Sequence, residues 1–426
     1  MRKFTKYNIS VDYSIIFCIC VFFILLAFIF DTPSRIIKDF YTINTSRSVL
    51  ITDYIALAGI GAALVNLAVT CLFCLFLLII NKREANGRII AALFVTMGFS
   101  LFGKNLFNML PLLFGIWIHA KVKKVKFKEV IVQAIMSATI APIVSEVAFL
   151  NDDITLLRIA LAYAIGMFVG FIFPVVAEAA KRMHRGYCLY NSGVAGGFIA
   201  TLFVGLLKST GTFITPEHFW STSHTVLLAV FAYTMSIALI LFGIAADRPV
   251  NAFTKFKQLI NEKDVRDIDF LVKYGNTCYI NIGIMCIIST SIVLLIGIPL
   301  NGPVMGGIFT ISGFSASGKH LKNSLPILLG SVLATYLNHL EMASPLNALA
   351  ILFSAGLAPI SGKHGWYCGI IVGFLHVSVA IFIGNLNGGL NLYNNGFAEG
   401  FLAITIVPLI VFFKEVLTRK KGSELE

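Results

Sequence analysis

Long apolar runs separated by short polar segments make up most of this sequence. The clearest runs cover residues 12–30, 54–80, 154–180, 222–246 and 270–297. A helix needs about 20 consecutive apolar residues to cross the hydrocarbon core of a bilayer. Each of these runs is long enough, so the pattern predicts an all-α polytopic membrane protein.

Residues 89–119 form an apolar stretch that is interrupted by the polar tripeptide Gly103-Lys104-Asn105. Basic segments flank it on both sides, at 82–88 and 121–128, so its two ends should lie on the same side of the membrane. Each arm of about 15 residues would rise about 22 Å, less than the ~30 Å of the hydrocarbon core. The stretch therefore predicts either a re-entrant hairpin or two short helices that meet inside the membrane.

The chain contains an internal repeat. Residues 86–115 align with 301–330 without a gap, and 14 of the 30 aligned positions are identical. A second pair of blocks, 186–193 and 389–396, shares the pattern Leu-Tyr-Asn-x-Gly. The shared Gly, Lys, Asn, Tyr and Pro residues keep their order, so we expect two membrane repeats, residues 1–213 and 217–426.

Loop charges predict that the second repeat is inverted. The first repeat should cross the membrane an odd number of times, so the second would start on the opposite side. Segments 121–128 and 181–185 are basic, whereas the matching segments 338–341 and 384–388 contain no Lys or Arg. Cytoplasmic loops carry an excess of Lys and Arg. We therefore expect residues 121–128 and both chain termini inside, and residues 338–340 outside.

Composition agrees with a membrane protein, since 58% of the residues are hydrophobic and only 13% are charged. A soluble domain averages about 25% charged residues. The net charge of +12 comes from short loops between apolar runs and not from a basic domain, so we expect no nucleic-acid partner. The expected partners are the lipid bilayer and a small-molecule or ion substrate, and homo-oligomerisation stays open.

No pattern in the sequence favours an enzyme. The HExxH and GxSxG motifs are absent, and most of the eight cysteines lie inside apolar runs. Segment 313–320, GFSASGKH, is close to the P-loop G-x-x-x-x-G-K-[ST], but His320 replaces the hydroxyl residue that Mg²⁺ requires, and no strand precedes it. We therefore expect no catalytic residues, no metal and no cofactor.

The two polar interruptions predict a substrate site. A glycine lets the chain turn, and the helix that follows then begins inside the membrane with free N–H groups and the positive end of its dipole. Broken helices at matching positions of inverted repeats usually mark a transporter's substrate site. We expect the site to contain Gly103, Lys104, Asn105 and Asn108 from the first repeat, Gly318, Lys319, His320 and Asn323 from the second, and Tyr190, Asn191, Tyr393 and Asn394 from the Leu-Tyr-Asn-x-Gly blocks.

Two expectations concern the charges of this site. Both repeats keep a lysine, Lys104 and Lys319, which predicts one central cavity that favours an anionic group. The alternative is that these lysines only reach a membrane interface. Glu146, Glu178 and Glu399 are candidates for intramembrane acids and proton relays, although the repeat preserves none of them.

The GFSxxGKxxxNxxP and LYNxG blocks carry a resemblance to a known family. The sequence resembles the uncharacterised bacterial membrane proteins called domain of unknown function 1576, which also contain a duplicated repeat. The resemblance covers essentially the full chain and implies a multi-pass protein of the bacterial plasma membrane, but no activity. The layout is also similar to that of urea transporters, which have two inverted halves with pore helices.

These observations lead to one functional prediction with alternatives. We expect a transporter for a small polar, and in one version anionic, solute, with its site where the two broken hairpins meet. The alternatives are a channel or facilitator, which would leave an open polar path between the hairpins, and a membrane enzyme or scaffold.

Overall fold

The computed structural model describes residues 10–49, 52–149, 154–214 and 219–423. The basic residues at positions 2, 3 and 6, the acidic loop 151–153 and part of the boundary between the repeats lie outside these ranges. Described residues of the first half form the helices α1 (Val11–Phe30), α2 (Pro33–Thr45), α3 (Tyr54–Ile80), α4 (Gly87–Phe99), α5 (Leu106–Val122), α6 (Phe127–Ser137), η1 (Ala138–Ile140), α7 (Pro142–Phe149), α8 (Leu156–His184) and α9 (Asn191–Ser209).

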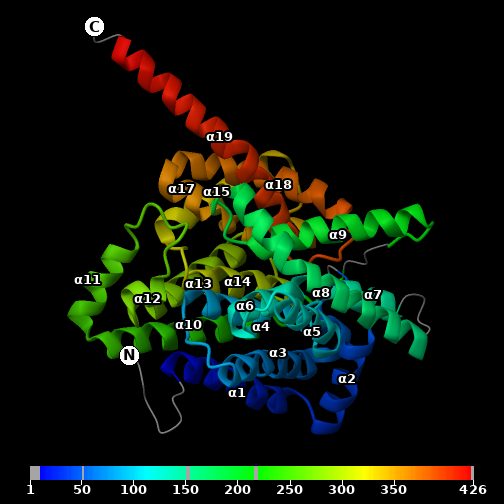
Figure 1. The fold of residues 1–426 in the computed structure, drawn as a ribbon. Helices are drawn as coiled ribbons and strands as arrows, with labels where there is room; N and C mark the ends of the chain where they lie inside the picture. Colours follow the sequence, from blue (N-terminus) through cyan, green and yellow to red (C-terminus); the bar gives the residue numbers. More distant parts are fainter. Residues whose placement is uncertain (1–9, 50–51, 150–153, 215–218, 424–426) are drawn as a thin grey trace.

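The second half has the same order of helices, with the short α12 added. It contains α10 (Thr225–Asp247), α11 (Pro249–Leu259), α12 (Phe270–Tyr274), α13 (Thr277–Leu295), α14 (Gly302–Phe314), α15 (Leu321–Leu337), α16 (Pro345–Phe353), η3 (Ser354–Leu357), α17 (Ala358–His364), α18 (Trp366–Leu386) and α19 (Asn394–Ser423). Helices α1 and α3 lie side by side, and the C-terminal part of α19 extends away from the rest of the protein (Figure 1).

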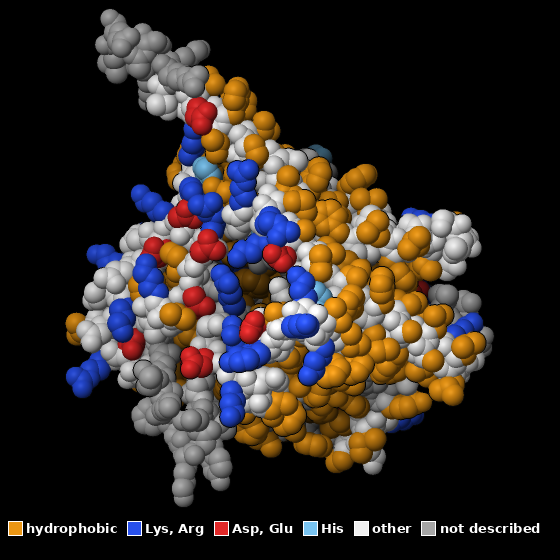
Figure 2. Space-filling view, viewed as in Figure 1, with side chains coloured by type: hydrophobic (Ala, Val, Ile, Leu, Met, Phe, Trp, Pro, Cys, Tyr) orange, Lys and Arg blue, Asp and Glu red, His pale blue; other side chains and the backbone are white. Residues whose placement is uncertain are grey.

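The protein is a polytopic helical membrane protein. Among the described residues, nine helices are long and apolar enough to cross a membrane, and the bent segment Phe127–Phe149 is a tenth candidate. The five apolar runs predicted from the sequence correspond to α1, α3, α8, α10 and α13. Large hydrophobic side chains are exposed along these helices, as lipid contact requires. Figure 2 shows hydrophobic side chains over much of the visible face, whereas the charged side chains gather in one region around a hollow.

Corresponding helices pack in the same way in the two halves. Gly115 of α5 lies so close to α8 that an added Cβ would be 2.0 Å from the Met167 carbonyl oxygen, and Gly330 of α15 lies in the same way against Ile370 of α18, at 2.1 Å. Small residues at such crossings let helix backbones approach within the membrane. Each half is therefore organised around a closely packed pair, α5–α8 or α15–α18.

Helices α4 and α14 pack against each other across the halves, as α9 and α19 also do, and α4 and α14 run antiparallel. An added Cβ at Gly98 would be 2.9 Å from Gly306, near the C-terminal end of α4 and the N-terminal end of α14. At the other end of the pair, Gly313 lies against Ala91. All thirteen residues of α14, and twelve of the thirteen in α4, are buried, so these short helices are enclosed by protein.

Candidate functional site

Both predicted interruptions are breaks between helices. The first separates α4 from α5 and the second separates α14 from α15. Gly103 has φ 86° and Gly318 has φ 139°, which are values that residues with a Cβ rarely adopt. At both breaks the lysine N–H donates back to the end of the preceding helix, from Lys104 to the Phe99 carbonyl and from Lys319 to that of Phe314. The glycines are therefore required by the backbone of the breaks.

One asparagine on a neighbouring helix holds each break. The Asn66 amide on α3 donates to the carbonyls of Ser100 and Lys104, at 2.7 and 2.9 Å. The Asn281 amide on α13 makes the same pair of bonds in the second half, at 2.8 and 2.7 Å. Carbonyl groups released from helices inside a membrane need such partners because water is absent there. Both asparagines thus have a structural role.

The predicted site residues that follow the lysines also complete the breaks. Asn105 and Asn108 form a capping box at the start of α5, and the Asn108 amide donates to the Gly103 carbonyl. In the second half the Asn323 side chain accepts from the His320 N–H and donates to the Gly318 carbonyl. These side chains satisfy helix ends, and their hydrogen bonds are directed into the breaks.

The two breaks do not meet near the midplane, so that expectation was wrong. An added Cβ at Gly87, the first residue of α4, would be 2.0 Å from the Ala316 carbonyl oxygen in the second break. Gly302, the first residue of α14, lies in the same way against Leu101 of the first break. Because α4 and α14 are antiparallel and each has 13 residues, the breaks are about 20 Å apart. The close packing of α4 on α14 occupies the space in which the hairpins were expected to meet.

A short segment covers each break. Residues 43–49, 52 and 53 lie over the first break, where Asn105 donates to the Ile43 carbonyl and Tyr54 N–H donates to that of Leu101. Residues 259–269 lie over the second break, where the His320 ring contacts the Glu262 carbonyl oxygen. The first residue of α12, Phe270, donates from its N–H to the Ala316 carbonyl at 3.0 Å. We call residues 43–49, 52 and 53 the first cover and residues 259–269 the second cover.

An aspartate at the end of each cover binds a helix of the other half. Asp53 accepts from the N–H groups of Ile55 on its own helix and of Gly302 at the start of α14. Asp269 accepts from Gly87 N–H at the start of α4, at 2.9 Å. A carboxylate at a helix N-terminus satisfies free N–H groups and balances the helix dipole. Each half therefore caps the central helix of the other.

One ion pair joins each cover to a short helix further along the same half, α7 or α17. In the first half, Arg47 of the first cover forms two hydrogen bonds to Glu146 of α7, at 2.6 and 2.9 Å. In the second half, Lys363 of α17 lies 3.0 Å from Asp264 of the second cover. We call these pairs the first and second latch. They occupy matching positions, but the charges are exchanged between cover and helix.

The second latch belongs to a larger charged cluster. Arg266 makes two hydrogen bonds to Asp264, at 2.7 and 2.6 Å, and its guanidinium lies over the Tyr187 ring at 4.6 Å. These hydrogen bonds, with the nearby Lys363, hold the pKa of the Asp264 carboxyl below its usual value. Asp264 therefore stays ionised at neutral and mildly acidic pH, and it can hold the cover to α17 through Lys363.

The Leu-Tyr-Asn-x-Gly blocks meet between the halves. The rings of Tyr190 and Tyr393 lie 4.6 Å apart, and both side chains are fully buried. The backbone N–H before each tyrosine donates across to the other half, from Leu189 to the Gly356 carbonyl and from Leu392 to that of Thr139. The two tyrosines therefore mark the centre of the molecule.

The asparagines of the same blocks are bonded to their own half. The Asn191 amide donates to the Ala177 carbonyl and its oxygen contacts the His184 ring. The Asn394 oxygen accepts from Asn387, one turn before the block. Their hydrogen bonds attach the starts of α9 and α19 to α8 and α18, so these side chains serve helix packing.

The second lysine lies beside the tyrosines, together with an acid. Lys319 is fully buried; it donates to the Tyr190 hydroxyl, and its ammonium lies 4.1 Å from the centre of that ring. Glu399 of α19 is also fully buried, accepts from Gly356 N–H at 3.0 Å and lies 3.5 Å from the Cys188 sulfur. We call Lys319, Glu399, Tyr190, Tyr393 and Cys188 the central cluster.

The first lysine has different surroundings. The Lys104 ammonium donates to the Thr96 hydroxyl at 3.0 Å and to the Ile135 carbonyl at 3.4 Å. It is buried, as Lys319 is, so neither lysine reaches an interface. Since the two ammonium groups have different partners at breaks about 20 Å apart, the expectation of one shared anion cavity was wrong.

Two of the three candidate acids have basic partners outside the centre. Glu146 belongs to the first latch, and Glu178 pairs with Arg182 on the exposed surface of α8. Sequence reasoning excluded Glu399 from the predicted site because the first repeat has Gly196 at that position. It also missed Cys188, both latches and the capping aspartates Asp53 and Asp269. Among these residues, only the two aspartates could have been found from the sequence, because Asp53 and Asp269 occupy matching places in the repeat.

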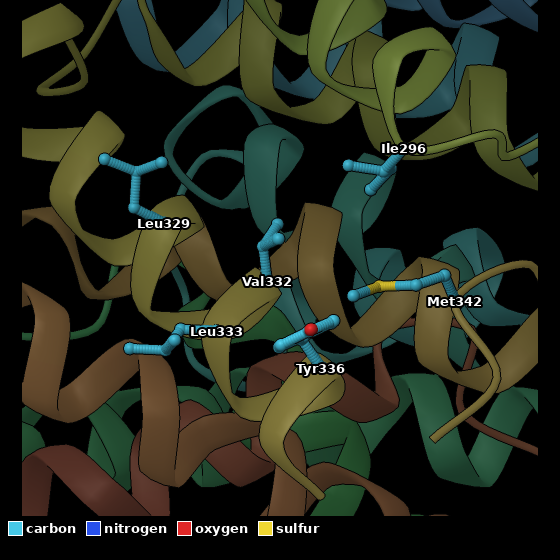
Figure 3. A pocket seen from close by; sticks show the side chains of 6 residues that line it. All are labelled: Ile296, Leu329, Val332, Leu333, Tyr336 and Met342. Carbon is cyan, nitrogen blue, oxygen red and sulfur yellow. The ribbon is translucent and has the colours of Figure 1, made fainter. Parts of the chain in front are cut away.

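The cavity shown in Figure 3 is apolar and lies elsewhere. Its lining comes from α15, from the turn after α13 and from the loop before α16, and no charged side chain contributes: it consists of Ile296, Leu329, Val332, Leu333, Tyr336 and Met342. Such a lining suits hydrocarbon and not a polar solute. Within the described ranges, no group of three His, Cys, Asp or Glu side chains could hold a metal ion.

Comparison with known proteins identifies one family. The description "Protein of unknown function (DUF1576)" matches residues 32–209 and 248–412, one segment in each half. No curated protein and no solved structure matches the chain.

Proposed function

The chain belongs to the DUF1576 family of proteins of unknown function, and from its centre and covers we propose that it is a transporter for a small polar solute. The observation that carries this proposal is a fully buried cluster with a lysine and a glutamate, in a protein whose two halves each have a matching cover joined to a helix by its own ion pair. A cluster without exposure to water requires a motion before any solute can reach it.

The matching covers support alternating access. A transporter needs one gate on each side, and the two gates must open in turn. The first latch joins the first cover to α7, and the second latch joins the second cover to α17. Because the latches are far apart and share no residue, one can open while the other stays closed. Broken helices at matching positions of two repeats are a common feature of such proteins.

The antiparallel packing of α4 and α14 supports insertion of the two halves in opposite orientations. On this arrangement the second cover faces the cytoplasm, together with the basic segments 121–128 and 181–185, and the first cover faces outward. We place both termini on the cytoplasmic side of a bacterial plasma membrane. The charge pattern of the loops and the family resemblance support this placement.

The composition of the central cluster suits a polar solute that makes hydrogen bonds. Lys319 and the two tyrosine hydroxyls can donate, and Glu399 can accept. The lysine alone would favour an anion, but the carboxyl group in the same cluster balances its charge. The cluster therefore favours a small solute with both donor and acceptor groups over a simple anion.

Cys188 offers a direct test because it is buried in the central cluster. A membrane-impermeant thiol reagent is added to vesicles of each orientation, and mass spectrometry measures alkylation at this position. In the unaltered protein both sides should label slowly. Asp264→Asn weakens the second latch and should speed labelling at least about tenfold from the cytoplasmic side only, the factor for ~1.4 kcal/mol. Glu146→Gln should do the same from the outer side only.

The control is Glu178→Gln, which removes an exposed ion pair with Arg182 that touches neither cover and should leave both rates unchanged. Rapid labelling of the unaltered protein from both sides would indicate a channel. If both latch variants speed Cys188 labelling from the same side, alternating access is excluded and a receptor or enzyme is favoured.

A further inference from the structure

The acid of the central cluster is present in one half only. Glu399 lies on α19, and the matching residue of α9 is Gly196. Otherwise the halves share their breaks, the asparagines that hold them, the tyrosines and the covers. A side chain that the fold required would be expected in both halves. Glu399 is therefore not explained by packing, and it breaks the symmetry of the centre.

The surroundings of Glu399 include one basic side chain and several groups that are ordinarily neutral. One carboxylate oxygen accepts from Gly356 N–H, and the other faces the Cys188 thiol at 3.5 Å. Lys319 comes from the second break and bonds to Tyr190, and Tyr393 lies against Tyr190 on the side of α19. The thiol and the two phenols are ordinarily neutral near pH 7. Lys319 and Glu399 thus set the charge of the cluster.

The net charge of this cluster must be small while both covers are closed. An isolated charge in a membrane interior costs at least ~2.5–3.5 kcal/mol, and a buried pair is stable only when both members keep their partners. With Glu399 ionised and Lys319 protonated, the cluster is neutral. When a cover opens and water enters, this restriction is removed, so the carboxylate can take up a proton.

We propose that Glu399 exchanges a proton with water when the centre opens, and that the proton is the ion coupled to solute movement; this inference rests on the proposed transport function. The step is balanced by hydronium: its proton forms an O–H bond at the Glu399 carboxylate, and water is left. The cluster with protonated Glu399 then keeps one positive charge on Lys319, which an anionic group of the solute neutralises before the cover closes.

A proton fits this place better than a metal cation does. Hard cations need about six or more oxygen ligands, whereas one Glu399 oxygen is held by a backbone N–H and the Lys319 ammonium lies in the same cluster. The ammonium would repel a metal ion and competes with it for the carboxylate. A proton requires only one oxygen and no new space.

The test is infrared difference spectroscopy of the purified full-length protein in lipid vesicles, recorded while the bulk pH is changed. The probe is the proton alone, and the signal is the C=O stretch of a protonated carboxyl group in an apolar environment. One such band should appear as the pH falls and should be lost in Glu399→Gln. In Lys319→Met the same band should appear at a pH at least about one unit higher, because the neighbouring positive charge is gone.

Glu178→Gln is the matched control, since this acid is exposed on α8 and its loss should leave the band unchanged. Glu399→Asp keeps a carboxyl group and should move the band without removing it, which covers the case that the glutamine variant does not fold. A band that persists unchanged in Glu399→Gln would overturn the proposal. The infrared band reports on proton binding without any transport, and Cys188 labelling reports on access without any carboxyl signal. Failure of the proton proposal is therefore distinguishable from failure of the transport proposal.

Discussion

Replacement of Asn66 or Asn281 by leucine should destabilise the protein by the same amount. Each amide donates to two carbonyls at its break, at 2.7–2.9 Å, and each side chain is fully buried. Leucine has a similar volume and donates no hydrogen bond. A buried acceptor that loses its donor costs about 1–3 kcal/mol, so two acceptors correspond to about 2–6 kcal/mol for each variant.

The assay is equilibrium unfolding in mixed micelles, in which the free energy of unfolding is compared between the variants. The two amides act at breaks about 20 Å apart, so the double variant should lose the sum of the single losses within about 0.5 kcal/mol. Asn81→Leu is the control, because the Asn81 amide donates to Leu77 within its own partly exposed helix end; it should cost less than about 1 kcal/mol. A loss under 1 kcal/mol in Asn66→Leu or Asn281→Leu would refute this account of the breaks.

Three further outcomes follow from the contacts between the halves. Gly98→Val should prevent folding, because its Cβ would be 2.9 Å from the Gly306 backbone. The control Gly205→Val, whose Cβ would have no atom within 4 Å, should fold normally. The yield of monodisperse protein measures both outcomes. Asp53→Ala should cost about 2–4 kcal/mol in the same unfolding assay, since backbone N–H groups of two helices lose their acceptor. Hydrogen bonds from a neighbouring arginine lower the pKa of Asp264. The stabilisation by its carboxylate is therefore present above the ordinary aspartate pKa of about 4 and is lost only as the pH falls through the lower pKa of the folded state. Hydrogen exchange of the second cover, corrected for intrinsic rates, should be equal at pH 7 and pH 5.

Local features of the fold could be predicted from the sequence, and contacts across the molecule could not. The breaks follow from a short pattern in which Gly103 and Gly318 permit the turn and the next asparagines cap the helix. The antiparallel packing of α4 on α14 leaves no comparable local pattern, because it depends on how the halves approach. That packing is why Lys104 and Lys319 are far apart, although the repeat suggested a shared cavity.

The functional residues that sequence reasoning missed, or left out of the predicted site, share one physical reason. A comparison of repeats finds residues that are the same in both copies. The latches exchange their charges, since Arg47–Glu146 corresponds to Asp264–Lys363, and Glu399 has no counterpart. On the proposed inverted arrangement, such residues are expected because the two matching halves must behave differently on the two sides of the membrane.

The inverted arrangement of the halves is the central claim, and the sidedness of two matching positions tests it most directly. Lys123 and Asn338 are the exposed C-caps of α5 and α15. Single cysteines at these positions are treated in intact cells with an impermeant maleimide, and again after permeabilisation. The account predicts that Asn338→Cys reacts in intact cells and that Lys123→Cys reacts only after permeabilisation. Reaction of both from the same side would contradict it.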